Sequence, residues 1–295
     1  MIVIDRLVKQ FGGARVLDEL TLSAPAGQRI ALVGSNGAGK TTLFRCLLGE
    51  YAYQGSISVD GLNPRRDRAR LLQMIGFVPQ IAPRLETPVG AFINYVAEVS
   101  GTSAGEIEAV ATNLGLDIAA IRKRAIVRLS GGMKQKLMIA LALGRPTTRL
   151  LILDEPTANL DPAARSSFYE LLAARSKDSA VIISSHRIDE IAPLVDRVVE
   201  LDRGRITLDD AVSDAGALGS TFFAKVETSR VEDSFARAAR EWGLKQLDER
   251  RWSGAIAGPD RLRFLGFVAR HAGLLAGVEL RELSRENENV DAVSA

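Results

Sequence analysis

The chain contains the glycine-rich segment Gly34-Ser35-Asn36-Gly37-Ala38-Gly39-Lys40-Thr41, which lies between an apolar run and a run of helix-forming residues. Glycines let the backbone approach an anion closely and turn its N–H groups toward it. The helix expected to begin near Lys40 adds the positive end of its dipole. Lys40 can reach the outer phosphates of a nucleotide, and the Thr41 hydroxyl can ligate Mg²⁺. The segment therefore predicts a phosphate-binding loop.

The residues on both sides supply the context that such a loop requires. Arg29 to Val33 is an apolar run typical of a strand, and Thr42 to Leu48 has the pattern of a helix. Gly49 is the expected end of that helix, since glycine adopts the left-handed conformation without penalty. Strand, loop and helix follow one another, so a chance glycine turn is a much weaker interpretation.

Two carboxylates follow a second apolar run. Leu150 to Leu153 has no polar interruption, which is typical of a parallel strand buried on both faces. Asp154 at its carboxyl end can hold Mg²⁺, and Glu155 can polarise an attacking water as a general base. The alternative is a pair of structural carboxylates at a strand end. The upstream phosphate loop favours the chemical interpretation.

A third motif lies between these two and includes Ser130-Gly131-Gly132, within the segment Leu129 to Gln135. A hydroxyl, two flexible amides and a new helix over Met133 to Leu143 make a second anion-binding end. The alternative is a helix cap with no ligand. One chain therefore offers two phosphate-binding surfaces.

Composition limits the classes of protein. The chain has 295 residues and a net charge of +2, from 38 basic and 36 acidic residues, which argues against a general nucleic-acid binder. A single cysteine, Cys46, excludes an internal disulfide framework and a multi-cysteine metal site. Asp5, Arg6 and Lys9 interrupt the N-terminal apolar run, so no secretion signal is expected. No apolar stretch approaches the ~20 residues of a membrane span.

The order of the three motifs, with Leu-Ser-Gly-Gly-Met-Lys-Gln just before the acidic strand, resembles the ATP-binding subunits of ABC transporters from about Ile2 to about Leu208. The resemblance implies an α/β fold: a P-loop, RecA-like core with an antiparallel β subdomain and a helical subdomain over about 82–147. It also implies binding of ATP and Mg²⁺, and ATP hydrolysis coupled to transport.

The resemblance assigns roles to individual residues. Gln80 matches the glutamine that senses Mg²⁺, Asp161 lies in the loop that crosses to a partner subunit, and His186 matches the switch histidine at the γ-phosphate. The implied catalytic residues are Glu155 and His186, and the implied metal ligands are Thr41, Gln80 and Asp154. The implied nucleotide-binding residues are Phe11, Val16, Ser35, Asn36, Gly37, Ala38, Gly39, Lys40, Thr41, Thr42, Gln80, Ser130, Gly131, Gly132 and Asp161.

The resemblance also implies partners. Each phosphate loop pairs with the Ser-Gly-Gly of another chain, so we expect a head-to-tail dimer with a second copy or a paralogous ATPase. An integral membrane permease is expected as a separate chain, which places this subunit at the cytoplasmic face of the membrane, with export favoured. We expect the permease to dock on Pro88 to Val99, where Phe92, Ile93, Tyr95 and Val96 supply apolar surface. The alternative for each of these four side chains is packing inside the subunit.

Two other functions remain in view. Non-transport ABC-type ATPases of repair and chromosome organisation insert a long coiled coil between the two halves of the motor, and the interval between Lys40 and Asp154 is too short for one. Non-transport ABC-type ATPases that act in translation carry two motor domains in a single chain, whereas this chain has the motifs of one. A pseudo-ATPase that only binds nucleotide is opposed by the joint presence of Lys40, Glu155 and His186.

The remainder of the chain predicts a second domain. Residues 209–219 are small and polar and read as a linker. Residues 220–295 predict the order β-α-β-β-α-β, which indicates a small α+β ferredoxin-like domain. Its one histidine, His271, is expected to be structural. An addition of this size resembles those on ATPases of the ABC-2 export type and of the copper-site maturation transporter for nitrous oxide reductase.

Overall fold

The computed structural model describes Met1 to Leu283 apart from residues 176–177, 186–187, 212–220 and 258–260, and residues 284–295 are likewise outside the description. The chain divides into two compact units. The N-terminal unit comprises Met1–His186 and Pro193–Ala211, and the C-terminal unit comprises Arg187–Ala192 and Val212–Ala295.

Strands and short helices alternate along the first half of the chain. The elements are β1 (Ile2–Phe11), β2 (Ala14–Ala24), β3 (Arg29–Val33), α1 (Lys40–Leu47), β4 (Gln54–Val59), α2 (Arg68–Met74), β5 (Ile75–Val78), α3 (Val89–Ser100), α4 (Ala104–Asn113), α5 (Ile118–Ile121), the 3₁₀ helix η1 (Ile126–Arg128) and α6 (Gly131–Leu143). The second half adds β6 (Leu150–Asp154), α7 (Pro162–Ala173), β7 (Ala180–Ser184), α8 (Ile188–Ile191), η2 (Ala192–Leu194), β8 (Arg197–Asp202), β9 (Arg205–Ala211), β10 (Thr221–Thr228), α9 (Asp233–Glu241), β11 (Lys245–Gln246), β12 (Arg251–Ala257), α10 (Arg261–Arg270), η5 (Ala272–Leu274) and β13 (Leu275–Leu283).

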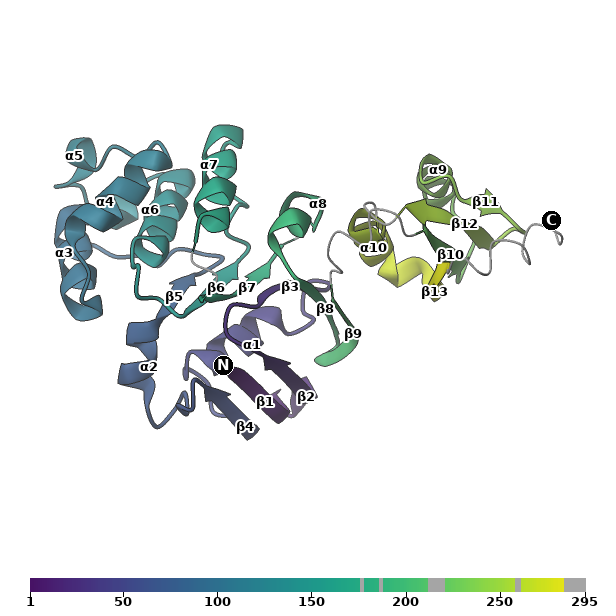
Figure 1. The fold of residues 1–295 in the computed structure, drawn as a ribbon, viewed down its shortest axis with the longest axis horizontal. Coiled ribbons are helices and arrows are strands. Elements are labelled where there is room, and N and C mark those ends of the chain that lie inside the picture. The colour runs from purple at the N-terminus through teal and green to yellow at the C-terminus, as the bar shows by residue number, and fades with distance from the viewer. Residues whose placement is uncertain (176–177, 186–187, 212–220, 258–260, 284–295) are drawn as a thin grey trace. The chain divides into compact units, whose positions relative to one another are not determined.

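Two sheets form the frame of the N-terminal unit (Figure 1). The larger has the order β5-β6-β7-β3-β8-β9, in which neighbours are parallel except for β8 and β9. The smaller is antiparallel, with the order β2-β1-β4. β6 and β7 are buried at every position, as a parallel strand covered on both faces requires. The carboxyl ends of β3, β6 and β7 therefore share one edge.

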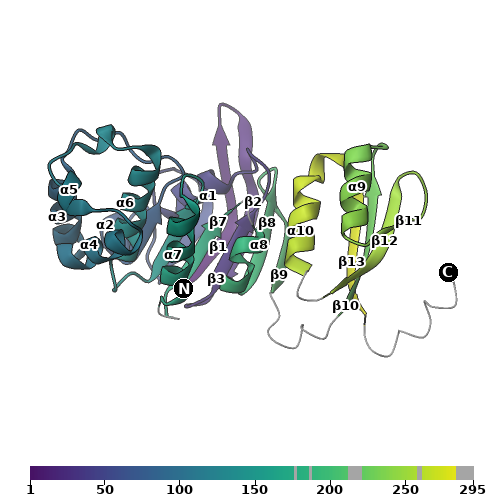
Figure 2. The ribbon, with the colours of Figure 1, turned by 90° about the horizontal axis from the view of Figure 1, so that it is seen from above.

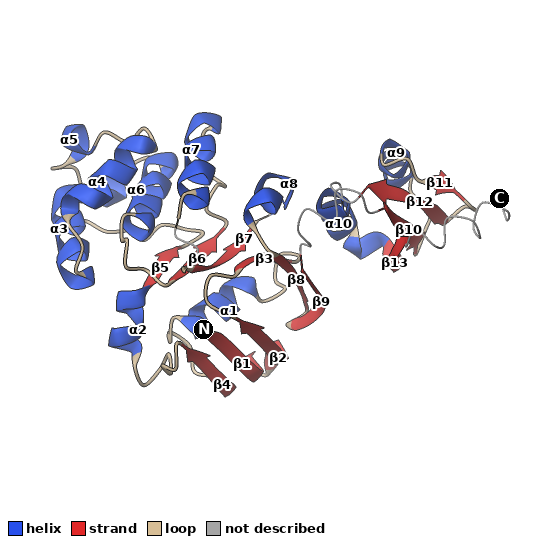
Figure 3. Ribbon diagram, viewed as in Figure 1, coloured by secondary structure: helices blue, strands red, loops and turns tan. Residues whose placement is uncertain are grey.

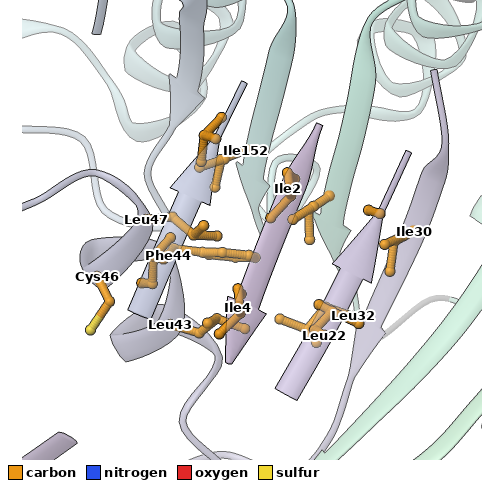
Figure 4. Close-up of a cluster of buried hydrophobic side chains, with 14 of the residues drawn as sticks. Ile2, Ile4, Leu22, Ile30, Leu32, Leu43, Phe44, Cys46, Leu47 and Ile152 are labelled. Carbon is orange, nitrogen blue, oxygen red and sulfur yellow. The ribbon is translucent and has the colours of Figure 1, made fainter. Parts of the chain in front are cut away.

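Helix α1 lies between the two sheets and joins their cores (Figures 1 and 4). Leu43, Phe44 and Leu47 of α1 are fully buried in one apolar cluster with Ile4 of β1 and Ile152 of β6. Phe44 alone buries enough apolar surface to stabilise the fold by several kcal/mol, on the order of 3–5 by the cost of truncating such a ring. The helix that begins at the glycine-rich loop is thereby fixed from both sides.

The same helix carries Cys46, whose thiol is buried. Burial raises the pKa of Cys46 to about 11, with a smaller opposing effect of Lys9. The thiol belongs to the apolar cluster that holds this helix.

Helices α3 to α6 gather on the β5 side of the larger sheet, and α7 lies beside strands β6 and β7 (Figure 3). Ser103 starts α4 with a capping box, in which its hydroxyl accepts from Glu106 N–H and the Glu106 carboxylate accepts from Ser103 N–H. A buried arginine, Arg145, and a half-buried one, Arg175, connect the helix ends. Arg145 donates to the carbonyls of Leu72, Gln73 and Ile75. Arg175 donates to the carbonyls of Leu143, Arg145 and Thr148, and we call Arg145 and Arg175 the arginine clasp.

The C-terminal unit holds an antiparallel sheet with the order β11-β12-β10-β13. Both α9 and α10 pack on one face of this sheet (Figure 2). Alternate residues of β10 point to that face, as the period of a strand dictates. They join one apolar cluster, which contains Phe222, Ala224, Val226, Phe235, Ala239, Leu244, Trp252, Ile256, Phe264, Phe267 and Leu274.

His271 belongs to the same packing. Its ring lies 5.3 Å from the Phe235 ring centroid and 4.8 Å from that of Phe267, and Nδ1 is 2.9 Å from the Phe267 carbonyl oxygen. These contacts support the structural role expected for this histidine.

The expected element order β-α-β-β-α-β of the C-terminal unit is confirmed, and its description as ferredoxin-like stays a prediction. One boundary differs. β9 continues to Ala211, so the start of the predicted linker belongs to a strand that pairs with β8. Helix α9 begins at Asp233, because Glu232 is extended at its N-cap.

Candidate functional site

A cavity of about 450 Å³ opens at the shared edge of β3 and β6. It is bounded by the glycine-rich loop, the first turn of α1, the start of β2 and the carboxyl end of β6. Its lining residues are Val16, Ser35, Asn36, Gly37, Gly39, Lys40, Thr41, Thr42, Gln80, Asp154 and Glu155. All of them are among the residues predicted from the sequence.

The loop needs glycine at two positions for steric reasons. Gly34 has φ +143°, and a Cβ there would lie 2.1 Å from the Leu201 carbonyl oxygen. Gly39 has φ +112°, and a Cβ would lie 2.9 Å from both the Val16 carbonyl oxygen and a Leu17 methyl. The loop is thus pressed against β2 and β8, which leaves room only for a hydrogen at these positions.

The turn between β8 and β9 fixes the loop from behind. Gly204 N–H donates to the Ala38 carbonyl at 2.9 Å, and the Gly204 carbonyl accepts from Asp18 N–H at 3.0 Å. Asp18 also accepts from Arg15 and Arg205. The hydrogen bond to Arg205 holds the pKa of Asp18 below its usual value, with Arg15 acting in the same direction. Local sequence pattern did not predict this contact, because it joins segments that are far apart in the chain.

Lys40 is buried in the cavity wall. Its Nζ donates to the carbonyl oxygens of Gly34 at 2.6 Å and Ser35 at 3.1 Å. Burial lowers the pKa of Lys40, and the carboxylates of Glu155 and Asp154 oppose that shift. A phosphate group in the cavity would act in the same direction as the carboxylates, since an opposite charge favours the protonated amine.

Asp154 is the centre of a hydrogen-bond chain that joins three elements. Thr41 Oγ1 donates to Asp154 Oδ2 at 2.7 Å, and Ser184 Oγ donates to Asp154 Oδ1 at 2.8 Å. Ser184 Oγ also accepts from Glu155 N–H at 2.9 Å. The chain connects α1, β6 and β7, and it leaves both carboxylates beside the phosphate loop.

Ser184 was not among the site residues predicted from the sequence. A polar residue at the end of an apolar run could have indicated a role for Ser184 in the site. Asp154 and Ser184 end neighbouring parallel strands and are register partners. Glu155 follows directly and has φ +48°, a left-handed conformation that is costly for a residue with a side chain. The bond from its N–H to Ser184 helps to hold it there.

Oxygen ligands for a hard cation meet at this place. Thr41 offers a hydroxyl, Asp154 a carboxylate and Gln80 an amide oxygen, and all three line the cavity. Within the described residues no group of three or more His, Cys, Asp or Glu side chains forms a metal cluster. The donor set suits Mg²⁺, which takes few protein ligands and completes its shell with water and phosphate.

Ser130, Gly131 and Gly132 do not line this cavity. Ser130 is the N-cap of α6, with its hydroxyl accepting from Met133 N–H at 3.3 Å. Ser130 and Gly131 are exposed, and a Cβ on Gly131 would meet open space. The motif therefore forms a second helix end that is open to an external ligand.

Two contacts tie that helix to the loop after Glu155. Gln135 is buried and its Nε2 donates to the Pro156 carbonyl at 3.0 Å. Lys136 forms an ion pair of 2.8 Å with Asp161, the N-cap of α7. The hydrogen bond from Lys136 lowers the pKa of Asp161. Neither role was predicted, because both depend on contacts between segments that are separate in the sequence.

Three further predicted residues, Phe11, Ala38 and Asp161, do not line the cavity. Phe11 is absent from its lining and packs edge-on against Tyr51, with ring centroids 5.1 Å apart and Lys9 Nζ 4.4 Å from the Phe11 ring. Ala38 is buried within the loop, where its carbonyl accepts the hydrogen bond from Gly204 N–H. His186 lies outside the described residues.

A glycine-rich loop at a helix N-terminus, a buried lysine and a strand-end carboxylate bonded to the adjacent threonine define a P-loop nucleotide-binding protein. Comparison with known proteins narrows this class. Residues 17–158 match the family model described as "ABC transporter". The chain belongs to the ATP-binding subunit family of ABC transporters.

Three similar proteins support the assignment. The Nod factor export ATP-binding protein I of Mesorhizobium japonicum is 38% identical over 206 residues, which cover 68% of this chain and 60% of that protein's length. The lantibiotic transport ATP-binding protein SrtF of Streptococcus pyogenes is 35% identical over 214 residues, covering 71% of this chain and 90% of that protein. A solved structure of the ATP-binding subunit of an ABC transporter superposes with a TM-score of 0.66 at 25% identity, covering 72% of this chain and 91% of that one. No helix in the described part of the chain is long and apolar enough to cross a membrane.

Replacing Ser184 with alanine is expected to lower the free energy of unfolding by about 1–3 kcal/mol, because a buried N–H and a buried carboxylate lose their shared partner. Urea unfolding followed by circular dichroism measures this loss. The matched control is Ser56→Ala, at an exposed position of β4, which should stay within about 0.5 kcal/mol of the parent. Equal stability of the two variants would contradict the role given to Ser184.

Proposed function

We propose that this chain hydrolyses ATP as one motor subunit of an ABC transporter and powers translocation through a separate membrane permease. The observation that carries the proposal is the convergence of Lys40, Thr41, Asp154 and Glu155 on one cavity. The motor is assigned to residues 1–208 and the accessory domain to residues 220–295, joined by a linker within 209–219. Two relatives named for export and lantibiotic transport favour the export direction.

The chain's own residues account for nucleotide binding. The backbone N–H groups of the loop and the N-terminus of α1 face the phosphates, and Lys40 exchanges its bonds to Gly34 and Ser35 for phosphate oxygens. Thr41, Asp154 and Gln80 would hold Mg²⁺, which when bound neutralises charge on the phosphate oxygens.

Glu155 is assigned as the general base. Its carboxylate orients a water toward the terminal phosphate and accepts a proton from it as the new phosphorus–oxygen bond forms, while the bond from the γ-phosphorus to the bridging oxygen breaks and ADP leaves. The hydrogen bond from Glu155 N–H to Ser184 Oγ fixes the Glu155 backbone. This reduces the freedom that the side chain has to lose during the reaction. His186 is assigned to contact the γ-phosphate, and Phe11 to stack on the adenine.

Glu155→Gln is expected to keep ATP binding and to lower the turnover of ATP by about 10²–10³-fold or more, because a neutral amide cannot take the proton. Fluorescent nucleotide binding and phosphate release measure the two effects separately. Glu241→Gln, at an exposed position of α9, is the matched control and should hydrolyse at the parent rate. A Glu155→Gln protein with parental turnover would remove Glu155 from the mechanism.

The exposed helix end of α6 supports a head-to-tail dimer as the working assembly. Ser130 and Gly131 offer a hydroxyl and backbone amides that the cavity of their own chain does not use. A second copy, or a paralogous ATPase, would bring these donors to the γ-phosphate in the first copy's cavity. Asp161, held by Lys136, lies in the loop assigned to cross between the subunits.

ATP should convert the Glu155→Gln chain from monomer to dimer, and a further Ser130→Arg change should abolish this conversion. The arginine side chain occupies the space that the phosphate contact needs. Light scattering with and without ATP reports the mass, and Ser56→Arg in the same background is the control for added bulk and charge. A dimer that forms with ATP in spite of Ser130→Arg would contradict the arrangement.

Helix α3 supports the assignment of a permease dock beside Gln80. Tyr95 and Val99 are 61% and 53% exposed, and Ile81, next to Gln80, is 82% exposed. Ile93 is buried with Val89 and Ala97 on the inner face, as the helical period requires, so its expected part in docking is wrong. Exposed apolar side chains on α3 and next to Gln80 suit contact with a short permease helix, and we assign the subunit to the cytoplasmic side of a membrane.

Tyr95→Lys together with Val99→Lys should release the permease from this subunit while the ATPase activity of the purified chain is retained. Charged side chains at these positions would have to be desolvated on docking. Co-purification from detergent-solubilised membranes measures the loss, with Val231→Lys, 59% exposed in the C-terminal unit, as the control. Retention of the permease by the double variant, and its loss on removing residues 212–295, would assign docking to the C-terminal unit instead.

A further inference from the structure

The C-terminal sheet has two very unequal edges. At one edge, β11 is only two residues long, Lys245–Gln246. At the other, β13 runs for nine residues, Leu275–Leu283, and pairs with β10 on its inner side. Among the described residues, no strand pairs with the outer side of β13.

An open edge of this length is a template for another strand, because its outward N–H and C=O groups need partners. Proteins usually protect such edges with proline, bulges or lysine. β13 contains no proline and no lysine. The one irregularity in its pairing with β10 lies at its first residue, and from Gly277 to Leu283 the register is regular. The edge is therefore flat enough to extend the sheet.

The sequence of β13 is complementary to itself. Glu279, Leu280 and Arg281 alternate acid, apolar and base. In an antiparallel pair of two β13 strands centred on Leu280, each Glu279 lies opposite the partner's Arg281. The dimer therefore contains two such pairs of opposite charges. Opposite charges in directly opposed positions stabilise a strand pair, and like charges destabilise it.

The faces of the strand agree with this register. Leu280 is opposite Ala224 and packs with the apolar cluster under the helices. Glu279 and Arg281 point to the other face, opposite Lys225 and Phe223. The Arg281 guanidinium lies 5.3 Å from the centroid of the Phe223 ring. The two leucines would thus meet on the helix-covered face and the four charges on the uncovered face.

We propose that the outer edge of β13 pairs antiparallel with β13 of a second copy of this chain, centred on Leu280, and so joins two four-stranded sheets into one. This contact involves a different surface from the head-to-tail motor contact and needs no nucleotide. A single strand pair buries little surface, so it forms a weak dimer alone. Together with the motor contact it raises the effective concentration of each subunit for the other.

Disulfide trapping of the full-length chain tests the register. Leu280→Cys brings two cysteines to directly opposed positions, where Cα atoms are about 4.5–5.5 Å apart and a disulfide can close. Val278→Cys is the matched control on the same face, because its two copies would be about 13 Å apart at about 3.4 Å per residue. The native Cys46 is buried and does not compete. Without nucleotide, we expect covalent dimer from Leu280→Cys and none from Val278→Cys.

Charge exchange on the exposed face gives a second test that does not alter the core. In the Leu280→Cys chain, Glu279→Arg or Arg281→Glu alone places like charges opposite each other and should lower the rate of cross-linking by about tenfold. The two changes together restore opposite charges and should restore the rate.

Several results would overturn the proposal. The first is that the Leu280→Cys chain forms no covalent dimer at any protein concentration tested. The second is that the Val278→Cys chain cross-links as well as the Leu280→Cys chain. The third is that the charge exchange leaves the cross-linking rate unchanged. Running the same assay with Ser130→Arg separates it from the motor dimer: the cross-link should persist there even though ATP-dependent assembly is lost. Loss of the cross-link in that variant would also count against an independent β13 contact.

Discussion

Everything at the nucleotide site depends on the position of one carboxylate. Asp154 receives hydrogen bonds from Thr41 at the start of α1 and from Ser184 at the end of β7, and these three segments are far apart in the sequence. The parallel register of β6 and β7 sets Asp154 and Ser184 side by side, and the buried face of α1 holds Thr41 within reach. A shift of β6 by one residue would reverse its faces and break both bonds. The site is therefore an outcome of the register of the central sheet.

The helix that begins at the Ser130 segment is linked to the loop after Glu155 by one hydrogen bond to the backbone and one ion pair. Gln135 bonds the carbonyl of Pro156, the residue that follows Glu155, and Lys136 holds Asp161 in the same loop. The arginine clasp secures the other ends of these segments, because Arg145 bonds carbonyls at the end of α2 and the start of β5, and Arg175 bonds the end of α6. Since β5 leads to Gln80, these hydrogen bonds connect the helical region with the backbone that carries a cavity residue.

The sequence was most informative where chemistry demands particular residues at fixed spacing. The phosphate loop, the apolar strand before Asp154 and the bounds of β3 and β7 could all be predicted from local pattern, because glycine geometry and strand burial act within a few residues. The contacts of Ser184, Gln135 and Gly204 could not, since each depends on which distant backbone group lies opposite. Ile93 was misassigned for a related reason: an apolar residue on a helix faces the core or the solvent according to its neighbours at i−4 and i+4. The position of Phe11 beside Tyr51 likewise depends on the pairing of β1 with β4.

The only cysteine of the chain lies on the helix that carries Lys40 and Thr41. With its thiol buried and its pKa raised to about 11, Cys46 is almost entirely in the unreactive thiol form at neutral pH. Alkylating reagents can reach it only when α1 separates from the sheets on either side. The rate of its modification therefore measures how often the phosphate-binding helix opens, and nucleotides that close the site should slow that reaction in proportion to the local stability they add. The protein thus carries a chemical probe of its own motor core, with no label to be introduced.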